Sequence, residues 1–170
     1  MILSDAGLYR ALQNGDLIVS PIEENQIQPA SIDLRLDRTL LNLDGEEFDI
    51  FDESYLLQPN EFILGSTLEY VEIPSTMVGI VDGRSSIGRL GVMIHITAGY
   101  IDAGYCGNIT LEIYNVSNKP FKLKYGDSIC QLVIELLNEP CIRPYGTSGL
   151  GSKYHCSDGV VASKYQEVDE

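Results

Sequence analysis

The sequence is short of positive charge. Its 170 residues hold 11 lysines and arginines against 25 aspartates and glutamates, a formal net charge of −14. Nucleic acids and anionic membranes attract basic surfaces, so neither is expected as the main partner. No lysine or arginine occurs between Arg38 and Arg84, and Arg89 then follows closely. A small anion could still bind where these few cations gather.

Long apolar runs, a leader sequence and paired cysteine motifs are also missing. The apolar runs are too short to span a bilayer, and the start, MILSDAGLYR, lacks the charged and apolar regions of a signal peptide. No C-x-x-C pair occurs among the four cysteines, Cys106, Cys130, Cys141 and Cys156. These features predict a cytoplasmic protein with reduced thiols and no membrane insertion.

Motifs for zinc and for phosphate loops are absent. The sequence has neither the H-x-E and P-C-x-x-C signature of zinc deaminases nor H-E-x-x-H, and no Walker-type or G-x-G-x-x-G loop. His95 and His155 have no partner at metal-ligand spacing, so each is interpreted as a satisfied structural histidine. Any hydrolytic water is therefore expected to be activated by side chains and not by zinc.

What is present is the pattern of a single all-β domain, residues 1–170. Ser4 or Asp5 can cap a short helix that presents Leu8 on one face and ends at Gly15. Short apolar segments then alternate with Gly, Pro, Asn and Asp, which is typical of a β-sandwich or barrel. The segments are LIVSPI, ASIDLRL, EFILGSTLEYVEIP, MVGIVDG, GVMIHITAG, NITLEIYN, FKLKYGD and ICQLVIELL.

The composition changes near the C-terminus. Small and polar residues replace the periodic apolar ones after Tyr145, so residues 146–170 are predicted to form a mobile tail, at least in the free protein. The tail carries Lys153 and Lys164, each followed by a tyrosine. Such lysines are usually just solvated, but they could also fold over a phosphate once a ligand is bound.

The two neighbouring arginines lie in the stretch GRSSIGRLG, residues 83–91. Ser85 or Ser86 is a good N-cap and Gly91 can end the turn, which predicts a helix of little more than one turn. Ser85 and Arg89, at i and i+4, share a face of that helix. The pattern is consistent with an anion site and equally with an ordinary capped turn whose arginines offset the acidic surroundings.

Two carboxylates form a second candidate. In the strand predicted for residues 109–114, alternate side chains point to opposite faces, so Glu112 stands beside Thr110 on the polar side. Asp102 is expected on the strand before it. Two such carboxylates can divide acid and base work if their environments separate their pKa values. The plainer alternative is that Glu112 faces water and Asp102 starts a turn.

Five segments taken together resemble the dCTP deaminase family, within the dUTPase-like superfamily. They are MILSD at the start, IQPASIDLRL at 27–36, GRSSIGRLGV at 83–92, HITAGYIDAGYCGNITLEIYN at 95–115, and PYG and GSKY within 144–154. The resemblance covers nearly the whole chain. It implies a distorted β-barrel or jelly roll, a homotrimer with active sites shared between subunits, and zinc-free deamination of dCTP. Mg²⁺ accompanies the triphosphate in that family, and dTTP is a possible inhibitor.

The resemblance also implies the site residues. The family's catalytic glutamate falls on Glu112, with Ser85, Arg89 and Asp102 as further catalytic residues. Nucleotide binding is expected at Arg84, Ser85, Ser86, Ile87, Gly88, Arg89, Asp102, Thr110, Leu111, Glu112, Gln131, Tyr145 and Lys153. One departure is Ser157, four residues after the lysine, where the family typically has a glutamine with a longer reach.

The pair Gly99-Tyr100 bears on the product. Family members that stop at dUTP tend to carry His-Arg there, whereas bifunctional members, which continue from dUTP to dUMP and pyrophosphate, carry Gly and an aromatic residue. The stretch AGYIDAGY also resembles the motif of trimeric dUTPases, in which the aspartate orients a water. The resemblance therefore favours a bifunctional enzyme that supplies dUMP for dTTP synthesis. The alternatives are a deaminase that releases dUTP, a dUTPase that has lost deamination, and a catalytically silent nucleotide sensor.

Overall fold

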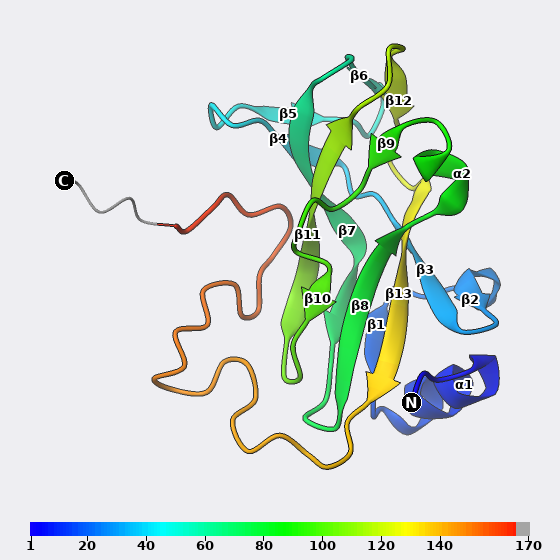
Figure 1. Cartoon of the computed structure of the whole chain (residues 1–170), viewed down its shortest axis with the longest axis vertical. Coiled ribbons are helices and arrows are strands. Elements are labelled where there is room, and N and C mark those ends of the chain that lie inside the picture. The colour runs from blue at the N-terminus through cyan, green and yellow to red at the C-terminus, as the bar shows by residue number, and fades with distance from the viewer. Residues whose placement is uncertain (166–170) are drawn as a thin grey trace.

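Antiparallel strands make up most of the regular secondary structure, as the computed structural model shows for residues 1–165 (Figure 1). Its helices are α1 (Asp5–Asn14), the 3-10 turn η1 (Glu24–Gln26) and α2 (Ser85–Gly88). Its strands are β1 (Ile18–Ser20), β2 (Ile27–Gln28), β3 (Ser31–Arg35), β4 (Thr39–Leu41), β5 (Glu47–Asp49), β6 (Tyr55–Leu57), β7 (Phe62–Glu72), β8 (Met77–Gly83), β9 (Val92–Met93), β10 (Tyr100–Ile101), β11 (Cys106–Asn115), β12 (Phe121–Leu123) and β13 (Ser128–Leu136).

Two large sheets enclose the core, and β6 and β12 form a third sheet of two strands. One has the order β5-β4-β7-β11-β9, with β1 also on β7, and the other has the order β10-β8-β13-β3-β2. Leucine, isoleucine and valine side chains from both sheets form one buried cluster between them. The all-β prediction is confirmed. The barrel is loose, because within the described residues the two large sheets meet at the isolated bridge between Leu36 and Thr67 and do not close into one continuous sheet.

Most of the predicted elements are present. Helix α1 ends at Gly15, which adopts φ 73°, and Leu8 on its inner face is buried, while Ser4 makes no capping side-chain bond. One prediction is wrong in extent: the segment GVMIHITAG forms only the two-residue strand β9 and then a loop. The loop forms because its backbone N–H groups bond a carboxylate, described below, in place of a neighbouring strand.

A buried carboxylate joins the two sheets. The side chain of Glu69, on β7, is fully buried and accepts bonds from the backbone and Nε of Arg35, at 2.8 and 2.6 Å. Gln26 of η1 donates to the same carboxylate at 2.9 Å. Since Arg35 ends β3, this cluster ties the second sheet to the first. A charge held away from water is tolerated only when it is paired and hydrogen-bonded in this way.

The prediction that the cysteines are reduced thiols is wrong for one pair. Cys106, the first residue of β11, forms a disulfide with Cys156 across a sequence separation of 50, whereas Cys130 and Cys141 are free thiols. The C-terminal segment returns to β11 and runs parallel to it, so that the backbones of Gly107 and Ser157 form a parallel β-bridge. That path brings the two sulphurs together, and sequence spacing alone does not reveal it.

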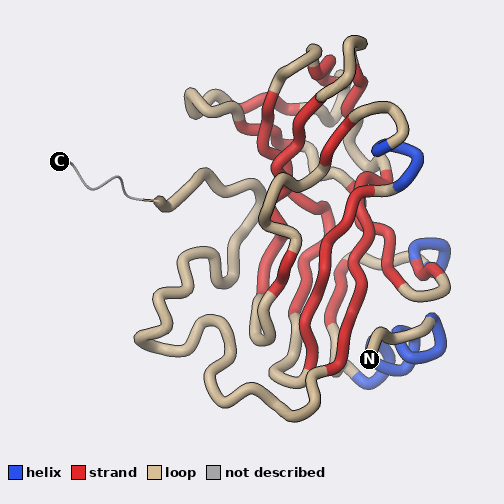
Figure 2. Tube along the Cα trace, viewed as in Figure 1, coloured by secondary structure: helices blue, strands red, loops and turns tan. Residues whose placement is uncertain are grey.

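The C-terminal segment crosses the outer face of the β11 sheet. Residues 146–165 form neither helix nor strand (Figure 2), but they are fastened to the body by hydrogen bonds and by the disulfide. Residues 166–170 of the predicted tail lie outside the described residues. Among residues 1–165, no helix is both long and apolar enough to cross a membrane.

Replacing Glu69 by Gln is expected to lower the free energy of unfolding by about 3 kcal/mol, because the poorly solvated charge of Arg35 loses its buried partner and keeps only the exposed Glu23. The matched control is Asp49→Asn, which breaks the exposed pair between Arg38 and Asp49. Exposed pairs contribute less than about 1 kcal/mol. Urea unfolding followed by circular dichroism at one chain concentration measures both. Equal losses in the two variants would contradict the assignment.

Candidate active site

The arginine and serine stretch forms the predicted short helix, but its cap differs. Helix α2 covers Ser85–Gly88, and its N-cap is the extended residue Arg84, not a serine. No side chain caps the helix. Gly91, at φ 79°, ends the turn as predicted. Ser85, Ser86 and Arg89 are exposed, so their polar groups are available to a ligand.

A buried aspartate anchors the first of the two arginines. Asp33 is almost fully buried on β3, and its Oδ2 lies 3.3 Å from a terminal nitrogen of Arg84. Gln131, opposite Asp33 on β13, donates to Asp33 Oδ1 at 3.3 Å. The guanidinium of Arg84 is thereby held at one end while part of it stays open to solvent. Sequence reasoning did not single out Asp33.

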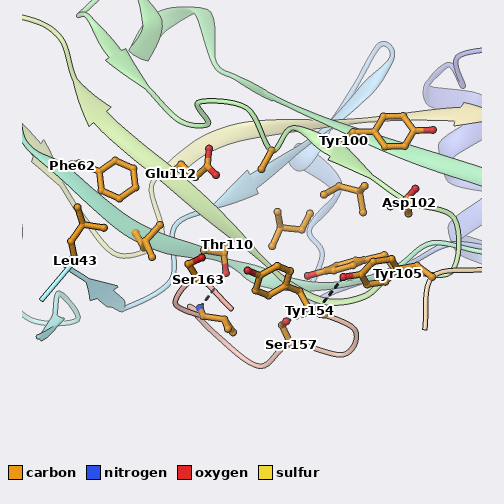
Figure 3. A pocket seen from close by; sticks show the side chains of 16 residues that line it. Leu43, Phe62, Tyr100, Asp102, Tyr105, Thr110, Glu112, Tyr154, Ser157 and Ser163 are labelled. Atoms are coloured by element: carbon orange, nitrogen blue, oxygen red, sulfur yellow. Dashed lines mark hydrogen bonds between the residues drawn. The ribbon is translucent and has the colours of Figure 1, made fainter. Parts of the chain in front are cut away.

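A cavity of about 380 Å³ lies between β10, β11 and the C-terminal segment (Figure 3). Its wall is formed by Leu43, Phe62, Leu64, Ala98, Tyr100, Ile101, Asp102, Tyr105, Ile109, Thr110, Glu112, Tyr145, Tyr154, Ser157, Val161 and Ser163. The wall is mostly apolar, with two carboxylates and several hydroxyl groups. Of the described residues that line it, none is a lysine or an arginine.

Glu112 points into this cavity and is held by backbone groups. Burial alternates along β11 as predicted, with Ile109, Leu111 and Ile113 in the core and Glu112 on the open side. Its Oε2 accepts bonds from the N–H of Ile96 at 2.8 Å and of Thr97 at 3.1 Å. These bonds fix the orientation of the carboxylate, and within residues 1–165 its Oε1 accepts no hydrogen bond.

Asp102 reaches the same cavity from the other sheet. It directly follows β10 and is not itself in the strand, and Figure 3 shows it on the opposite side of the cavity from Glu112. Its position depends on Gly99, whose carbonyl accepts a bond from the N–H of Val81 at 2.6 Å. A Cβ at Gly99 would lie only 2.7 Å from the carbonyl oxygen of Val81 and 3.0 Å from the ring of His95. This approach of β10 to β8 therefore requires glycine.

The prediction that His95 is a structural histidine with its hydrogen bonds satisfied is wrong. Its Nδ1 is buried and, within the described residues, has no hydrogen-bond partner, and its Nε2 is 3.8 Å from Asp82. The ring packs against Gly99, where there is no space for another side chain. His95 thus acts as a spacer for the Gly99-Tyr100 segment.

The C-terminal segment supplies one wall of the cavity. Ser157 is buried and accepts a bond through its carbonyl from the N–H of Asn108 at 2.9 Å, and Val161 N–H donates to Thr110 Oγ1 at 3.2 Å. The N–H of Tyr154 donates to the Tyr145 hydroxyl at 2.9 Å. Tyr154, Val161 and Ser163 were missed from the sequence, because their aperiodic segment carries no strand or helix pattern.

Tyr105 is a further wall residue that was missed. Burial raises the pKa of its hydroxyl, which stays protonated and donates to the carbonyl of Asn108 at 2.7 Å. Tyr105 lies in the turn between Asp102 and β11. The bond fixes this turn and so the spacing between the two carboxylates. The only signal for Tyr105 in the sequence was its place within the family-like stretch at residues 95–115.

The predicted site residues fall into two groups. Gly99, Tyr100, Asp102, Thr110, Glu112 and Tyr145 surround the cavity, whereas Arg84 to Arg89 and Gln131 lie together near α2. Helix α2 is on the side of the molecule away from the C-terminal segment (Figure 1). The Leu111 side chain faces the core, and Lys153 is exposed, with its Nζ 5.8 Å from the Tyr165 ring centre. The described chain does not bring the two groups into one cavity.

One cluster of potential metal ligands occurs in the described part of the chain: Cys106, His155 and Cys156. The two sulphurs are bonded to each other, so they offer no thiolate to a metal ion while the disulfide is intact. This cluster lies outside the set of residues that line the cavity.

Residues 2–137 match the family model described as dCTP deaminase-like. A protein of Dictyoglomus thermophilum named "dCTP deaminase, dUMP-forming" is 41% identical, covering 96% of this chain and 94% of that protein. A protein of Natronomonas pharaonis named "dCTP deaminase" is 43% identical, covering 98% and 95%.

Among solved structures, 2′-deoxycytidine 5′-triphosphate deaminase from Agrobacterium tumefaciens is similar, with a TM-score of 0.71 and 22% sequence identity. The match covers 80% of this chain and 48% of that one, so this chain spans about half of its length. At this identity the likeness speaks for the fold. The loose β-barrel architecture is therefore shared with a solved protein.

Replacing Gly99 by Ala is expected to cost about 1–3 kcal/mol of stability and to displace the segment that carries Asp102, since the new methyl overlaps the Val81 carbonyl. Gly83→Ala is the matched control, because a Cβ there meets Ile94 at an ordinary 3.4 Å. Thermal unfolding compares the two variants. If Gly99→Ala and Gly83→Ala unfold at the same temperature, the close approach of β10 to β8 is not the constraint described.

Proposed function

The chain belongs to the dCTP deaminase-like family, and from this premise we propose that it hydrolyses dCTP in two steps. The first gives dUTP and ammonia, and the second gives dUMP and pyrophosphate. The names of the relatives support this activity. The observation that carries the proposal is the Glu112 carboxylate, which two backbone N–H groups hold at the wall of a cavity of nucleotide size.

Glu112 is proposed as the proton carrier of deamination. Its Oε1 is free to take a proton from a water that attacks C4 of cytosine, and the same carboxyl then protonates N3. The carboxylate next carries the proton of the new C4 hydroxyl to the amino group, so that the C4–N bond breaks, ammonia leaves and the C4 carbonyl of uracil forms. A positioned acid–base group contributes roughly 10² to 10⁴ in rate. Leu64, which lies opposite Glu112 on β7, and Phe62 on the same strand offer an apolar surface to the pyrimidine ring.

The triphosphate needs cations that the cavity wall does not supply. Arg84 and Arg89, with Ser85, Ser86, Ile87, Gly88 and Gln131 nearby, are the proposed phosphate and water-positioning group. Because α2 lies away from the cavity of its own chain, we propose that a second copy presents this group. A homotrimer, in which each site is shared between neighbouring copies, satisfies this need by cyclic symmetry.

Asp102 is proposed for the second step. It is exposed at the cavity, where its carboxylate can orient a water toward the α-phosphorus of dUTP. Attack there breaks the bond to the β-phosphate and releases pyrophosphate. The tight packing at Gly99, which leaves no space for the histidine of members that stop at dUTP, supports this bifunctional assignment.

Mg²⁺ is proposed to enter with the triphosphate. The ion prefers oxygen ligands, commonly phosphates and water with one or two carboxylates, so the triphosphate itself would hold it. The exposed Asp102 at the cavity wall is a carboxylate compatible with such an ion, while Glu112 stays free for proton transfer. When bound, the ion neutralises phosphate charge. Thr110, the backbone at Leu111, Tyr145 and Lys153 are proposed nucleotide contacts, with the segment 146–170 closing over the ligand and dTTP as a competing inhibitor.

Two variants test the sharing of the site between copies. Glu112→Gln and Arg89→Ala are each expected to bind dCTP but to lose at least about 100-fold in ammonia release. Co-expressed with different tags and purified as mixed trimers, they are expected to recover about one third of the wild-type rate, because in a cyclic trimer of two kinds of chain one site of the three combines both wild-type residues. If verified mixed oligomers recover no ammonia release, Glu112 and Arg89 act together in a site within one chain.

Product analysis separates the two steps. Wild-type protein fed dCTP is expected to release ammonia and pyrophosphate in equal amounts, whereas Asp102→Asn should still release ammonia and accumulate dUTP, since only the orienting carboxylate is lost. Chromatography of the nucleotides with a pyrophosphate assay measures both. Wild-type dUTP accumulation without pyrophosphate would favour a dUTP-forming deaminase. Tight dCTP or dTTP binding without turnover would favour a nucleotide sensor.

A further inference from the structure

The disulfide lies where the C-terminal segment meets the cavity. Cys106 begins β11, the strand that carries Thr110 and Glu112, and Cys156 lies between Tyr154 and Ser157, which line the cavity. Cys156 adopts φ 53°, a left-handed conformation that favours glycine. The bond therefore holds a strained residue in place beside a cavity wall.

Past the disulfide, the segment is held to β11 by a few hydrogen bonds. Gly159 N–H donates to Asn108 Oδ1 at 3.1 Å, and Val161 N–H donates to Thr110 Oγ1 at 3.2 Å. The segment forms no regular ladder with β11 beyond the single bridge between Gly107 and Ser157. Few contacts of this kind give low local stability, so a covalent tie has a large share in keeping the wall assembled.

The surroundings of the sulphurs suit thiol exchange. Cys106 is buried, whereas Cys156 is exposed and open to attack by an external thiol. The ring of His155 lies against both sulphurs, with Nε2 3.5 Å from Cys106 Sγ and Nδ1 3.4 Å from Cys156 Sγ. An imidazole in this position stabilises a departing thiolate or gives it a proton.

We propose that the Cys106–Cys156 bond is a redox-responsive clasp, a thiol-exchange site whose substrate is a dithiol reductant and whose opening loosens the cavity wall at residues 154–163. In the oxidised protein the clasp keeps Ser157 and Val161 docked on β11, and the cavity is ready for ligand. In the reduced protein the segment detaches more often, and the ligand must order it on binding.

The exchange takes place in two steps that balance in atoms and electrons. One thiolate of the dithiol attacks Cys156 Sγ, the S–S bond breaks, and Cys106 leaves as a thiolate that takes a proton. The second thiolate of the reductant then attacks the mixed disulfide and releases Cys156, which also takes a proton. The reductant is oxidised to its disulfide by two electrons, and the protein gains two thiols.

Trypsin provides a test that does not depend on activity. Cleavage after Lys153 and Lys164 cuts residues 154–164 out of the chain, and this fragment stays attached to the body through Cys156 only while the clasp is closed. In full-length wild-type protein, dithiothreitol is expected to raise the initial rate of cleavage after Lys153 and Lys164 about 5- to 10-fold, because a locally open segment is the form that is cut. Mass spectrometry without reductant should find the cut fragment still attached.

Three variants isolate the clasp. Cys156→Ser, an exposed substitution, and Cys106→Ser are expected to show the fast cleavage with or without dithiothreitol. Cys141→Ser, which removes a thiol outside the clasp, should keep the wild-type response. Thiol titration of unfolded wild-type protein is expected to find two free thiols before reduction and four after it. Four free thiols that resist oxidation, or a dithiothreitol response that persists in Cys156→Ser, would overturn the proposal.

The activity readout rests on the proposed function. The KM for dCTP is expected to rise about 3- to 10-fold on reduction or in Cys156→Ser, with kcat little changed, since ordering the wall draws on binding energy. An unchanged KM alongside redox-dependent cleavage would show that the clasp does not serve the nucleotide site and would overturn that part of the proposal. Absence of any dCTP turnover would count against the proposed function alone, because the cleavage test stands without it.

Discussion

The buried carboxylate of Glu69 is the constraint on which the arrangement of the site depends. It binds Arg35 at the end of β3 from its own place on β7, and so fixes one sheet relative to the other. Strand β3 also carries Asp33, the anchor of Arg84, while β7 is paired along its length with β11, which carries Glu112. Both groups of site residues are therefore positioned from strands that meet at this one ion pair.

The charges divide between the two faces of the chain. Carboxylates point into the cavity, and the arginines lie near α2, each group with its own anchor. An anion as large as a triphosphate would be repelled by either carboxylate unless cations faced it from another source. The division of the predicted site residues between two faces is thus a physical argument for the proposed assembly, and the strongly acidic composition leaves an anion few competing places to bind.

Local periodicity made much of the fold predictable from the sequence. The sequence predicted three features that depend on residues close together in the chain. They are the alternation of burial on β11, the end of α1 at Gly15 and the short helix at Ser85–Gly88. The loop at 94–99 was not predicted, since its apolar residues mimic a strand while its amides bind Glu112. The path of the C-terminal segment, and with it the disulfide, depends on contacts about 50 residues away in sequence, for which the composition carries no signal.

The backbone hydrogen bonds to Glu112 affect how the sequence of the loop at 94–99 can vary. Its two donors are the main-chain amides of Ile96 and Thr97, so the bond does not depend on which side chains those positions carry. Every amino acid except proline brings the same N–H group. The loop can therefore change its side chains to suit a neighbouring copy or a different nucleotide while the carboxylate keeps its aim. Selection for the proposed reaction would leave almost no mark on the identity of the two residues that orient Glu112.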